Sequence, residues 1–330
     1  MTVEPSTRVM KADSEAVAAA ARCLANGGLV AFPTETVYGL GADAQDGIAV
    51  ARLYDAKGRP AFNPLIAHVP DLAAARRLAH FDGAAERLAT ALWPGPLTLV
   101  LPKAPGCAVA ELATAGLDSI AVRVPDHPVA REILAAFGRP VVAPSANRSG
   151  HVSPTTAQHV LADLRGRIDL IIDGGATLVG LESTIVACLA EPALLRPGGV
   201  PRAAIEHVLG QPLGEAPLQP DADEGEAPLA PGQLASHYAP RSRLRLDAAT
   251  IAPGEALLAF GPQPPAGSAP VRMLNLSARG DLIEAAANLF SHLRALDAAG
   301  TASIAVMPVP HEGLGEAIND RLRRAAAPRP

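Results

Sequence analysis

Two basic residues, Lys57 and Arg59, open the segment AKGRPAFNPLIAH, which also carries Asn63 and His68. Two prolines frame the loop between these residues and restrict its backbone. A rigid loop can hold charged and polar groups toward an anion, and a phosphate suits an arginine fork beside a lysine. A lysine near the end of a helix is also an ordinary partner of the helix dipole. The segment predicts a phosphate site, and a purely structural lysine is the alternative.

A second polar cluster follows the apolar run Leu29–Phe32, which is long enough for a buried strand. Pro33 has no N–H for the strand ladder and is expected to end it. Polar residues and two glycines come next: Thr34, Glu35, Thr36, Tyr38, Gly39 and Gly41. Polar side chains just beyond a buried strand are typical of a binding crevice at the edge of an α/β sheet. An ordinary polar turn is the alternative.

Further polar residues lie at the ends of apolar stretches along the chain. Ser119 and Arg123 share one face of the predicted strand SIAVRVP, and Ser145 and Asn147 have like spacing in PVVAPSAN. The remaining members are Ser153, Glu182, Ser183, Thr184 and Arg196. Serine and asparagine are common in loops, so each cluster alone is weak. Together they predict side chains that converge on one crevice.

Alternating helices and strands must position these residues. Helices are expected at 16–26, 48–57, 71–80, 84–92, 127–137, 155–164 and 202–209, with Asp13 and Asp46 as caps and Gly58 as a stop. Strands are expected at 29–32, 65–69, 97–102, 119–125, 140–147 (passing into a loop), 168–173, 183–189 and 193–196. Short apolar runs with polar ends favour a mixed sheet in a layered α/β domain.

The composition changes at Gly210. Residues 210–232 are rich in proline and hold five acids with no Lys or Arg, which is typical of a linker. The motif HYAP at 237–240 follows, and from Arg241 a strand at 256–260, a helix at 281–299, a strand at 303–309 and a helix from 315 predict a small α/β unit. The expected division is a catalytic domain at 1–209, a linker and lid at 210–240, and a C-terminal domain at 241–330.

Composition excludes several classes of protein. Hydrophobic residues make up 49% of the 330 residues, so a full core is expected, and a net charge of −5 argues against a broad nucleic-acid footprint. The three cysteines form no CxxC pair, and the N-terminus lacks the apolar core of a signal peptide. No apolar run approaches the roughly 18 residues of a membrane helix. These features predict a cytoplasmic protein without a membrane partner, and no P-loop, GxSxG or HExxH motif occurs.

The motifs PTETVYGLG, KGRPAFNPLIAH, WPGPLTLVLP, TAGLDSIAVRVPDHP, APSANRSG, IIDGG, ESTIV and LLRPG occur in this order, within a stretch of similarity that covers residues from about 13 to 209. Together they resemble the threonylcarbamoyl-AMP synthase family, whose catalytic domain is YrdC-like. HYAP and the closing GLGEAINDRLRRAA resemble the longer, two-domain form of that family. The resemblance implies a three-layer twisted mixed sheet with a concave, positively charged cleft, followed by a smaller Rossmann-like α/β domain.

The resemblance also implies a nucleotidyltransferase reaction. L-threonine, bicarbonate or CO2, and ATP would give L-threonylcarbamoyladenylate and pyrophosphate, for N6-threonylcarbamoyladenosine in tRNA. Mg2+ is expected through the ATP phosphates and water, with no protein metal ligands. The implied partner is the downstream tRNA threonylcarbamoyl-transferase machinery, met transiently, with weak or indirect tRNA binding.

Family positions carry over onto this sequence residue by residue. The implied catalytic tetrad is Lys57, Arg59, Ser145 and Asn147. The implied threonine contacts are Thr36, His68, Arg123, the backbone of Ala143, and Ser183. The implied ATP contacts are Arg59, Asn63, Ser119, Ser145, Ser153, Arg196 and Tyr238.

Roles follow from the chemistry of these side chains. Lys57, Arg59 and Arg196 suit neutralisation of phosphate charge, and Arg123 suits a carboxylate fork. Tyr238, beside the linker, would close as a lid over a labile adenylate. Two alternatives stay open: an RNA-binding module that uses the same basic cleft, and a carbamoyl-adenylate transferase like larger relatives, which the missing acylphosphatase-like and zinc-finger segments disfavour.

Overall fold

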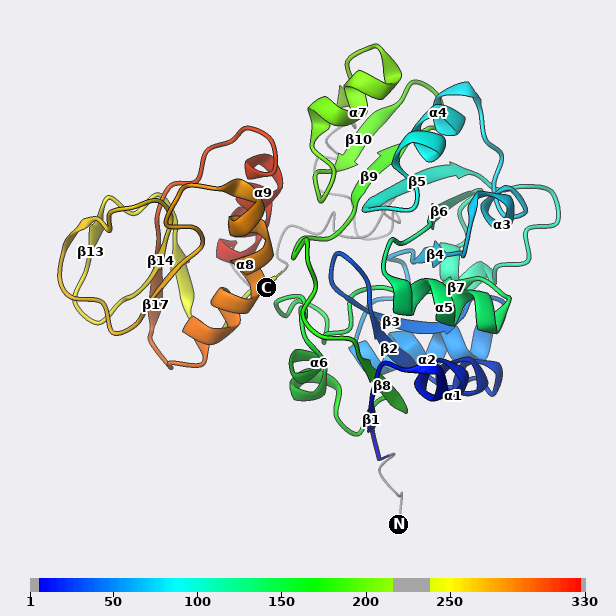
Figure 1. Ribbon diagram of the computed structural model, residues 1–330, viewed down its shortest axis with the longest axis horizontal. Coiled ribbons are helices and arrows are strands. Elements are labelled where there is room, and N and C mark those ends of the chain that lie inside the picture. Colours follow the sequence, from blue (N-terminus) through cyan, green and yellow to red (C-terminus); the bar gives the residue numbers. More distant parts are fainter. Residues whose placement is uncertain (1–5, 216–237, 328–330) are drawn as a thin grey trace.

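A computed structural model describes residues 6–215 and 238–327 (Figure 1). Within these residues the strands form an 11-stranded mixed sheet, a four-stranded sheet and a two-stranded sheet. The large sheet has the order β1-β8-β2-β3-β7-β4-β6-β5-β9-β10-β11 and combines parallel and antiparallel pairs. The predicted α/β fold with a mixed sheet and a second, smaller domain is confirmed.

The strands of the large sheet are short and mostly buried. They are β1 (Arg8–Lys11), β2 (Val30–Pro33), β3 (Tyr38–Asp43), β4 (Ile66–His68), β5 (Leu97–Pro102), β6 (Ser119–Arg123), β7 (Val141–Val142), β8 (Leu170–Asp173), β9 (Thr184–Ala187), β10 (Ala193–Arg196) and β11 (Gly214–Glu215). The accompanying helices are α1 (Ser14–Ala25), α2 (Gly47–Lys57), α3 (Leu72–Arg76), α4 (Gly83–Leu92), α5 (Pro128–Phe137), α6 (Ala157–Leu164) and α7 (Arg202–Leu209), with a 3₁₀ turn at Glu111–Thr114.

Local sequence explains where helices α1 and α2 begin and end. The Asp13 side chain accepts a hydrogen bond from the backbone N–H of Ala16 at 2.8 Å, and Asp46 caps α2 in the same way. Gly58 ends α2 in a left-handed backbone conformation, with φ of 59°. Residues with a side chain adopt this conformation only at a steric cost. These predicted caps and the predicted stop are confirmed, and they fix the position of Lys57 on the last turn.

Two helical layers flank the large sheet. Helices α2, α3, α4, α6 and α7 pack on one face, in a core with the side chains of Leu65, Ala67, Leu99 and Val122. Helices α1 and α5 pack on the other face, over β1, β2, β7 and β8. Over β4, β6, β5, β9 and β10 that second face carries a small apolar cluster: Ile66, Val100, Ala121, Ile185, Ala187 and Leu195. We call this second face, over these five strands, the site face.

The C-terminal unit has a four-stranded parallel sheet in the order β12-β17-β14-β16. Its strands are β12 (Arg243–Arg245), β14 (Ala256–Ala259), β16 (Met273–Asn275) and β17 (Ser303–Val306), and its helices are α8 (Leu282–Asp297) and α9 (Gly315–Ala326). Both helices share one core on one sheet face, and Figure 1 shows them on the side toward the larger domain. The small pair β13 (Thr250–Ile251) and β15 (Ala266–Gly267) lies beside the other face, where Ile251 joins the core.

The structure differs from the expected elements at several places. The segment after Pro33 is a hairpin and not a simple turn, since β3 pairs antiparallel with β2. Gly41 pairs with Val30, and the lack of a side chain there leaves room for the Phe32 ring. The expected helix 71–80 is only α3, and β1 and the 3₁₀ turn were not predicted. Strand β11 extends the large sheet to Glu215, beyond residue 209. Residues 216–237 of the predicted linker and lid lie outside the described residues.

Candidate active site

Lys57 ties helix α2 to the loop after β7. Its side chain is 3% exposed, and its ammonium donates to the backbone oxygens of Ser145 and Asn147, both at 2.5 Å. Burial, followed by the charge of Arg59, holds the pKa of Lys57 well below its usual range. The predicted tetrad of Lys57, Arg59, Ser145 and Asn147 therefore gathers at one place, with lysine as the link.

Arg59 and Arg196 add positive charge around this point. Arg59 is half-buried and donates to the backbone oxygens of Asn63 and Pro64 at 3.3 and 3.1 Å. Burial lowers the pKa of Arg59 to about 10, and the charge of Arg196 contributes in the same direction. Arg196 is buried on β10 and donates to the Ser183 backbone oxygen at 2.9 Å. Arg59 lies within electrostatic reach of both Lys57 and Arg196, and a group of cations of this kind forms a site for a highly charged anion.

Arg123 lies at the end of β6 and is 4% exposed. Its Nη2 donates to Glu35 Oε1 at 2.5 Å and to Thr36 Oγ1 at 3.0 Å, and its Nε donates to the Gly95 oxygen at 3.3 Å. Glu35 Oε2 in turn accepts the backbone N–H of Asp126. Since these contacts occupy Nε and Nη2, Nη1 is the nitrogen of Arg123 without a partner among the described residues. The whole fork is therefore not available to a carboxylate, and the contact would come from Nη1.

Strand register brings a row of polar side chains onto the site face. His68 on β4 pairs in register with Arg123, and Thr98 on β5 lies on the same face of the next strand. Thr98 and Ser183 share a hydrogen bond of 2.7 Å between their hydroxyls. Burial, followed by the charge of Arg123, lowers the pKa of His68 to about 3, so its ring is neutral at physiological pH. This row offers neutral hydrogen-bonding groups beside one cation.

The predicted ATP and threonine contacts separate along the same strands. Asn63 precedes β4 and Ser119 begins β6, whereas His68 and Arg123 end these two parallel strands. Four residue steps along a strand span about 13 Å. The backbone N–H of Ala143 donates to the Ile66 oxygen at 3.1 Å and carries the chain beyond β7 toward Ser145. An elongated ligand pair along β4 and β6 would touch both groups.

Two buried amides have an unused acceptor. Asn63 and Asn147 are each 1% exposed, and the side-chain oxygen of each has no hydrogen-bond partner among the described residues. An unpaired buried acceptor costs about 1–3 kcal/mol. Both residues belong to the predicted site, so a bound ligand with N–H or O–H donors would offset this cost.

Ser153 and Tyr238 contact the C-terminal unit. Ser153 is fully buried and its hydroxyl donates to Glu182 Oε1 at 2.5 Å. Tyr238 is 1% exposed and stacks on Phe290 of α8 with a centroid distance of 5.5 Å. Electrostatic contact with Arg59 and Arg196 places Tyr238 beside the cations. Tyr38, by contrast, points away, since its hydroxyl donates to the Gly175 oxygen.

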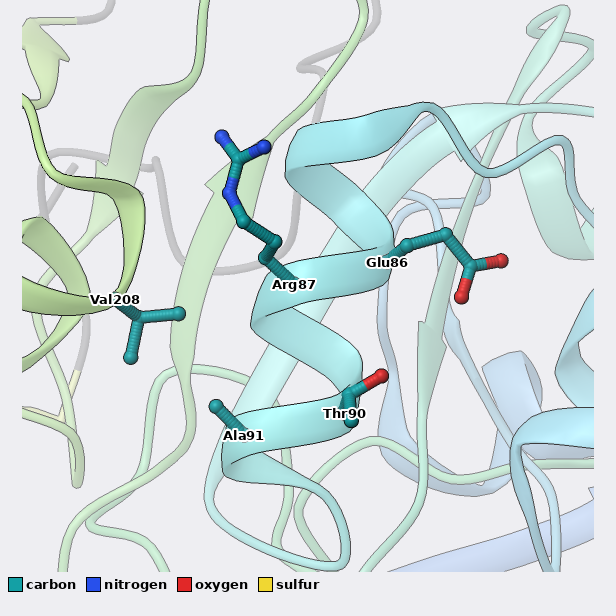
Figure 2. Close-up of a pocket in the computed structure, with 5 residues that line it drawn as sticks. All are labelled: Glu86, Arg87, Thr90, Ala91 and Val208. Atoms are coloured by element: carbon teal, nitrogen blue, oxygen red, sulfur yellow. The ribbon is translucent and has the colours of Figure 1, made fainter.

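A surface hollow of about 420 Å³ lies elsewhere, between α4 and α7 (Figure 2). Its lining is Glu86, Arg87, Thr90, Ala91 and Val208. Helices α4 and α7 pack on the sheet face opposite the site face. Glu86 turns away to an exposed ion pair with Arg76. The hollow gathers no converging polar groups and does not contribute to the candidate site.

The residues that sequence reasoning missed are the ones that support the site. Thr98 was detectable as the only hydroxyl in LTLVLP, on the face opposite the leucines. Glu35 was noted as polar, but its ion pair with Arg123 joins residues 88 positions apart. Arg321 of α9 carries no signal in its own helix that distinguishes it from neighbouring arginines. Long-range pairing of this kind is not encoded in local spacing.

Among residues 6–215 and 238–327, no cluster of three or more His, Cys, Asp or Glu side chains could hold a metal ion. The carboxylates at the site, Glu35 and Glu182, are both occupied by arginines. This donor set fits Mg2+ that is carried by substrate phosphates and water. In the same described ranges, no helix is long and apolar enough to span a bilayer.

The fold and the site define a two-domain α/β protein with a buried, cationic candidate site on one sheet face. Residues 22–198 match the Sua5, YciO and YrdC family model, described as telomere recombination. Residues 200–327 match the model of the threonylcarbamoyl-AMP synthase C-terminal domain. The chain belongs to the threonylcarbamoyl-AMP synthase family.

Curated relatives and a solved structure agree with this membership. The chain is 40% identical over 336 residues to the threonylcarbamoyl-AMP synthase of Bacillus subtilis, with 95% of this chain and 93% of that relative covered. It is 43% identical over 321 residues to that of Pyrococcus abyssi, with 93% of each chain covered. The crystal structure of P. abyssi Sua5 complexed with L-threonine matches with a TM-score of 0.86, 38% identity and 97% coverage of each chain.

Proposed function

We propose that this protein is an L-threonylcarbamoyladenylate synthase, a nucleotidyltransferase that uses L-threonine, bicarbonate or CO2, and ATP. The observation that carries the proposal is the convergence of Lys57, Arg59 and Arg196 beside the polar row of His68 and Arg123. The cations suit a triphosphate, and the polar row suits an amino acid. The matched relatives bear the name of this activity.

The reaction needs positioning and charge neutralisation, and it needs no protein nucleophile. The threonine amine attacks CO2, and the resulting carbamate loses a proton. A carbamate oxygen then attacks the α-phosphorus of ATP, and the bond to pyrophosphate breaks. Lys57 and Arg59 would stabilise charge on the phosphates. Two N–H groups of the Lys57 ammonium bind carbonyls, and the third, which has no hydrogen-bond partner among residues 6–215 and 238–327, would make this contact.

The threonine end would be read by Arg123, His68, Thr36, Ser183 and the backbone of Ala143. Arg123 Nη1 would hold the carboxylate, with Glu35 fixing the guanidinium. Neutral His68 would contact threonine by hydrogen bonding and not by charge. The threonine amine can then lie unprotonated near CO2, since Glu35, the carboxylate beside Arg123, is already paired with that arginine.

The nucleotide end would involve Asn63, Ser119, Ser145, Ser153, Arg196 and Tyr238. Arg321, Arg196 and Ser153 outweigh burial and hold the pKa of Glu182 below its usual value, so Glu182 is ionised and Ser153 is the donor. Ser153 therefore offers a ligand only an acceptor lone pair. A ribose hydroxyl or the adenine amine could use it, whereas a phosphate oxygen could not.

Magnesium, cellular location and partners complete the proposal. Mg2+ would neutralise the phosphates of ATP and be held by them and by water. The protein would act in the cytoplasm and pass its labile product to the tRNA threonylcarbamoyl-transferase machinery. Tyr238 would exclude water from the mixed anhydride.

Pyrophosphate release tests the proposal. Purified protein is incubated with ATP and Mg2+, with bicarbonate and L-threonine added singly and together. We expect release only when both are present. Release without threonine would indicate another acceptor and contradict the proposal. No release, together with tRNA binding that weakens steeply with salt, would favour the RNA-binding alternative, although the buried cations Lys57, Arg123 and Arg196 suit a small anion better.

A further inference from the structure

The C-terminal unit anchors the loops that carry the candidate site. Val37, Val152 and Leu181 of the larger domain are buried in the same apolar cluster as Leu289 and Ile318 of helices α8 and α9. Each of the three lies one or two positions from a predicted substrate contact, namely Thr36, Ser153 and Ser183. The core of the small unit thus forms part of the support for the site.

One arginine of α9 contacts three residues beside the candidate site: Glu182, Pro197 and Tyr238. Arg321 is 0% exposed; its Nε donates to Glu182 Oε2 at 2.8 Å, and its Nη2 donates to the Pro197 oxygen at 3.0 Å. Its guanidinium carbon lies 5.2 Å from the ring centroid of Tyr238, within the range of a cation–π contact. Asp320 accepts from Nη1 at 2.5 Å and completes the set.

Glu182 bridges Arg321 and Ser153. One oxygen of Glu182 binds Arg321 and the other accepts the Ser153 hydroxyl, so the carboxylate orients the serine only while the arginine orients the carboxylate. A second arginine of the small unit, Arg294 on α8, donates to the backbone oxygens of Val152 and Ser153. The segment that carries Ser153 is held by its side chain and by its backbone.

We propose that Arg321 is a positioning residue for the nucleotide end of the site, acting through Glu182 on Ser153 and directly on Tyr238. This inference rests on the proposed function of the site and assigns a role in it to the C-terminal unit. Arg123, the cation of the threonine end, is held within the larger domain by Glu35, and the hydrogen bonds of Arg321 reach neither residue. Loss of Arg321 should therefore weaken nucleotide binding selectively.

The test uses the full chain and two matched variants of helix α9. Arg321→Lys keeps the charge but cannot bind Glu182, Pro197 and Tyr238 together. Glu316→Gln removes a different ion pair between this helix and the larger domain, Glu316–Arg202, which involves no predicted substrate contact. A non-hydrolysable ATP analogue and L-threonine are titrated separately by calorimetry. We expect R321K to weaken analogue binding at least tenfold and threonine binding less than threefold, with E316Q within twofold of wild type for both.

A double-mutant cycle separates positioning from general loosening of the fold. Ser153→Ala is combined with R321K, and analogue affinity is measured for all four proteins. If Arg321 acts through Ser153, the two losses are strongly sub-additive, because S153A removes the group that Arg321 positions. If R321K is poorly folded, R321M/E182Q replaces it, since this pair leaves no buried charge without a partner.

Equal weakening of analogue and threonine, unchanged analogue binding in folded R321K, or additive losses in the cycle would each overturn the inference. Failure of the proposed function is recognised independently, in wild-type protein that binds the analogue but shows no threonine-dependent pyrophosphate release. The comparison between variants remains decisive in that case, because it measures binding and not turnover.

Discussion

Replacing Arg123 by lysine tests the threonine end of the site most sharply. The substitution keeps the positive charge beside Glu35. A lysine ammonium cannot also reach Thr36, the Gly95 oxygen and the threonine carboxylate, which Nη1 of Arg123 would bind. A hydrogen bond to a charged group contributes about 1.5–3 kcal/mol. Loss of the Nη1 contact should therefore weaken threonine binding roughly 10- to 100-fold.

The same contacts set the cost in stability. Two hydrogen bonds to neutral groups are lost, each worth about 1 kcal/mol, so the free energy of unfolding should fall by about 2 kcal/mol. Arg52→Lys is the control, because Arg52 forms an ion pair with Asp169 with side chains 47% and 34% exposed, and such pairs contribute about 0–1 kcal/mol.

Calorimetry with L-threonine and with a non-hydrolysable ATP analogue, beside urea unfolding, measures these effects. We expect R123K to lose threonine affinity, to bind the analogue within twofold of wild type and to remain folded. A folded R123K with wild-type threonine affinity would show that Arg123 does not bind threonine, and equal losses of affinity for both ligands would show that its effect is not specific to the threonine end.

Three further predictions follow from the site geometry. Lys57→Met and Arg59→Met should each lower the rate of pyrophosphate release at least 100-fold in folded protein. Each substitution removes a donor that stabilises the phosphate charge in the transition state by about 3 kcal/mol. Near-normal turnover would exclude that residue from the catalytic set. Between pH 8 and pH 5, His68 should lower the free energy of unfolding of the wild-type protein by about 2 kcal/mol. In the unfolded chain its ring takes up a proton below the usual pKa of about 6.5, whereas in the folded protein, with a pKa of about 3, it does not. Urea titrations should show a smaller loss in His68→Gln, and an unchanged pH dependence would mean that His68 is not buried in its neutral form. Gly198→Ala should lower the free energy of unfolding by about 1–3 kcal/mol and lower the affinity for both ligands, because its Cβ would lie 2.4 Å from backbone atoms of Glu182, Ser183 and Thr184. Gly47→Ala is the control: its Cβ would meet nothing within 4 Å, so the free energy of unfolding should change by less than about 0.5 kcal/mol.

Sequence predicts much of the fold because caps and apolar periodicity act locally. Asp13, Asp46 and Gly58 mark helix ends that the structure confirms. Strand β3 escaped prediction because its sequence, YGLGAD, holds two glycines and reads as a turn, yet the pairing with Phe32 and its neighbours selects an extended backbone. Tertiary contact outweighs local propensity there.

The site is predictable to a lesser extent, for a related reason. Ser119 and Arg123 lie an even number of positions apart in SIAVRVP, which correctly assigns them to one face of the strand. Only the register of β4, β6 and β5 aligns His68, Arg123 and Thr98. The roles of these residues remain predictions that rest on family resemblance and geometry. Contacts that join the two domains, such as Arg321 with Glu182, depend on packing that no local pattern encodes.

The identity of the product is the most direct test of the proposed synthase activity. Wild-type protein is incubated with ATP, Mg2+, L-threonine and 13C-labelled bicarbonate, and the adenylate fraction is analysed at once by mass spectrometry. We expect a species that contains threonine, AMP and one 13C atom, formed in step with pyrophosphate. An adenylate of threonine without the labelled carbon, or pyrophosphate release with no adenylate, would contradict the proposed activity.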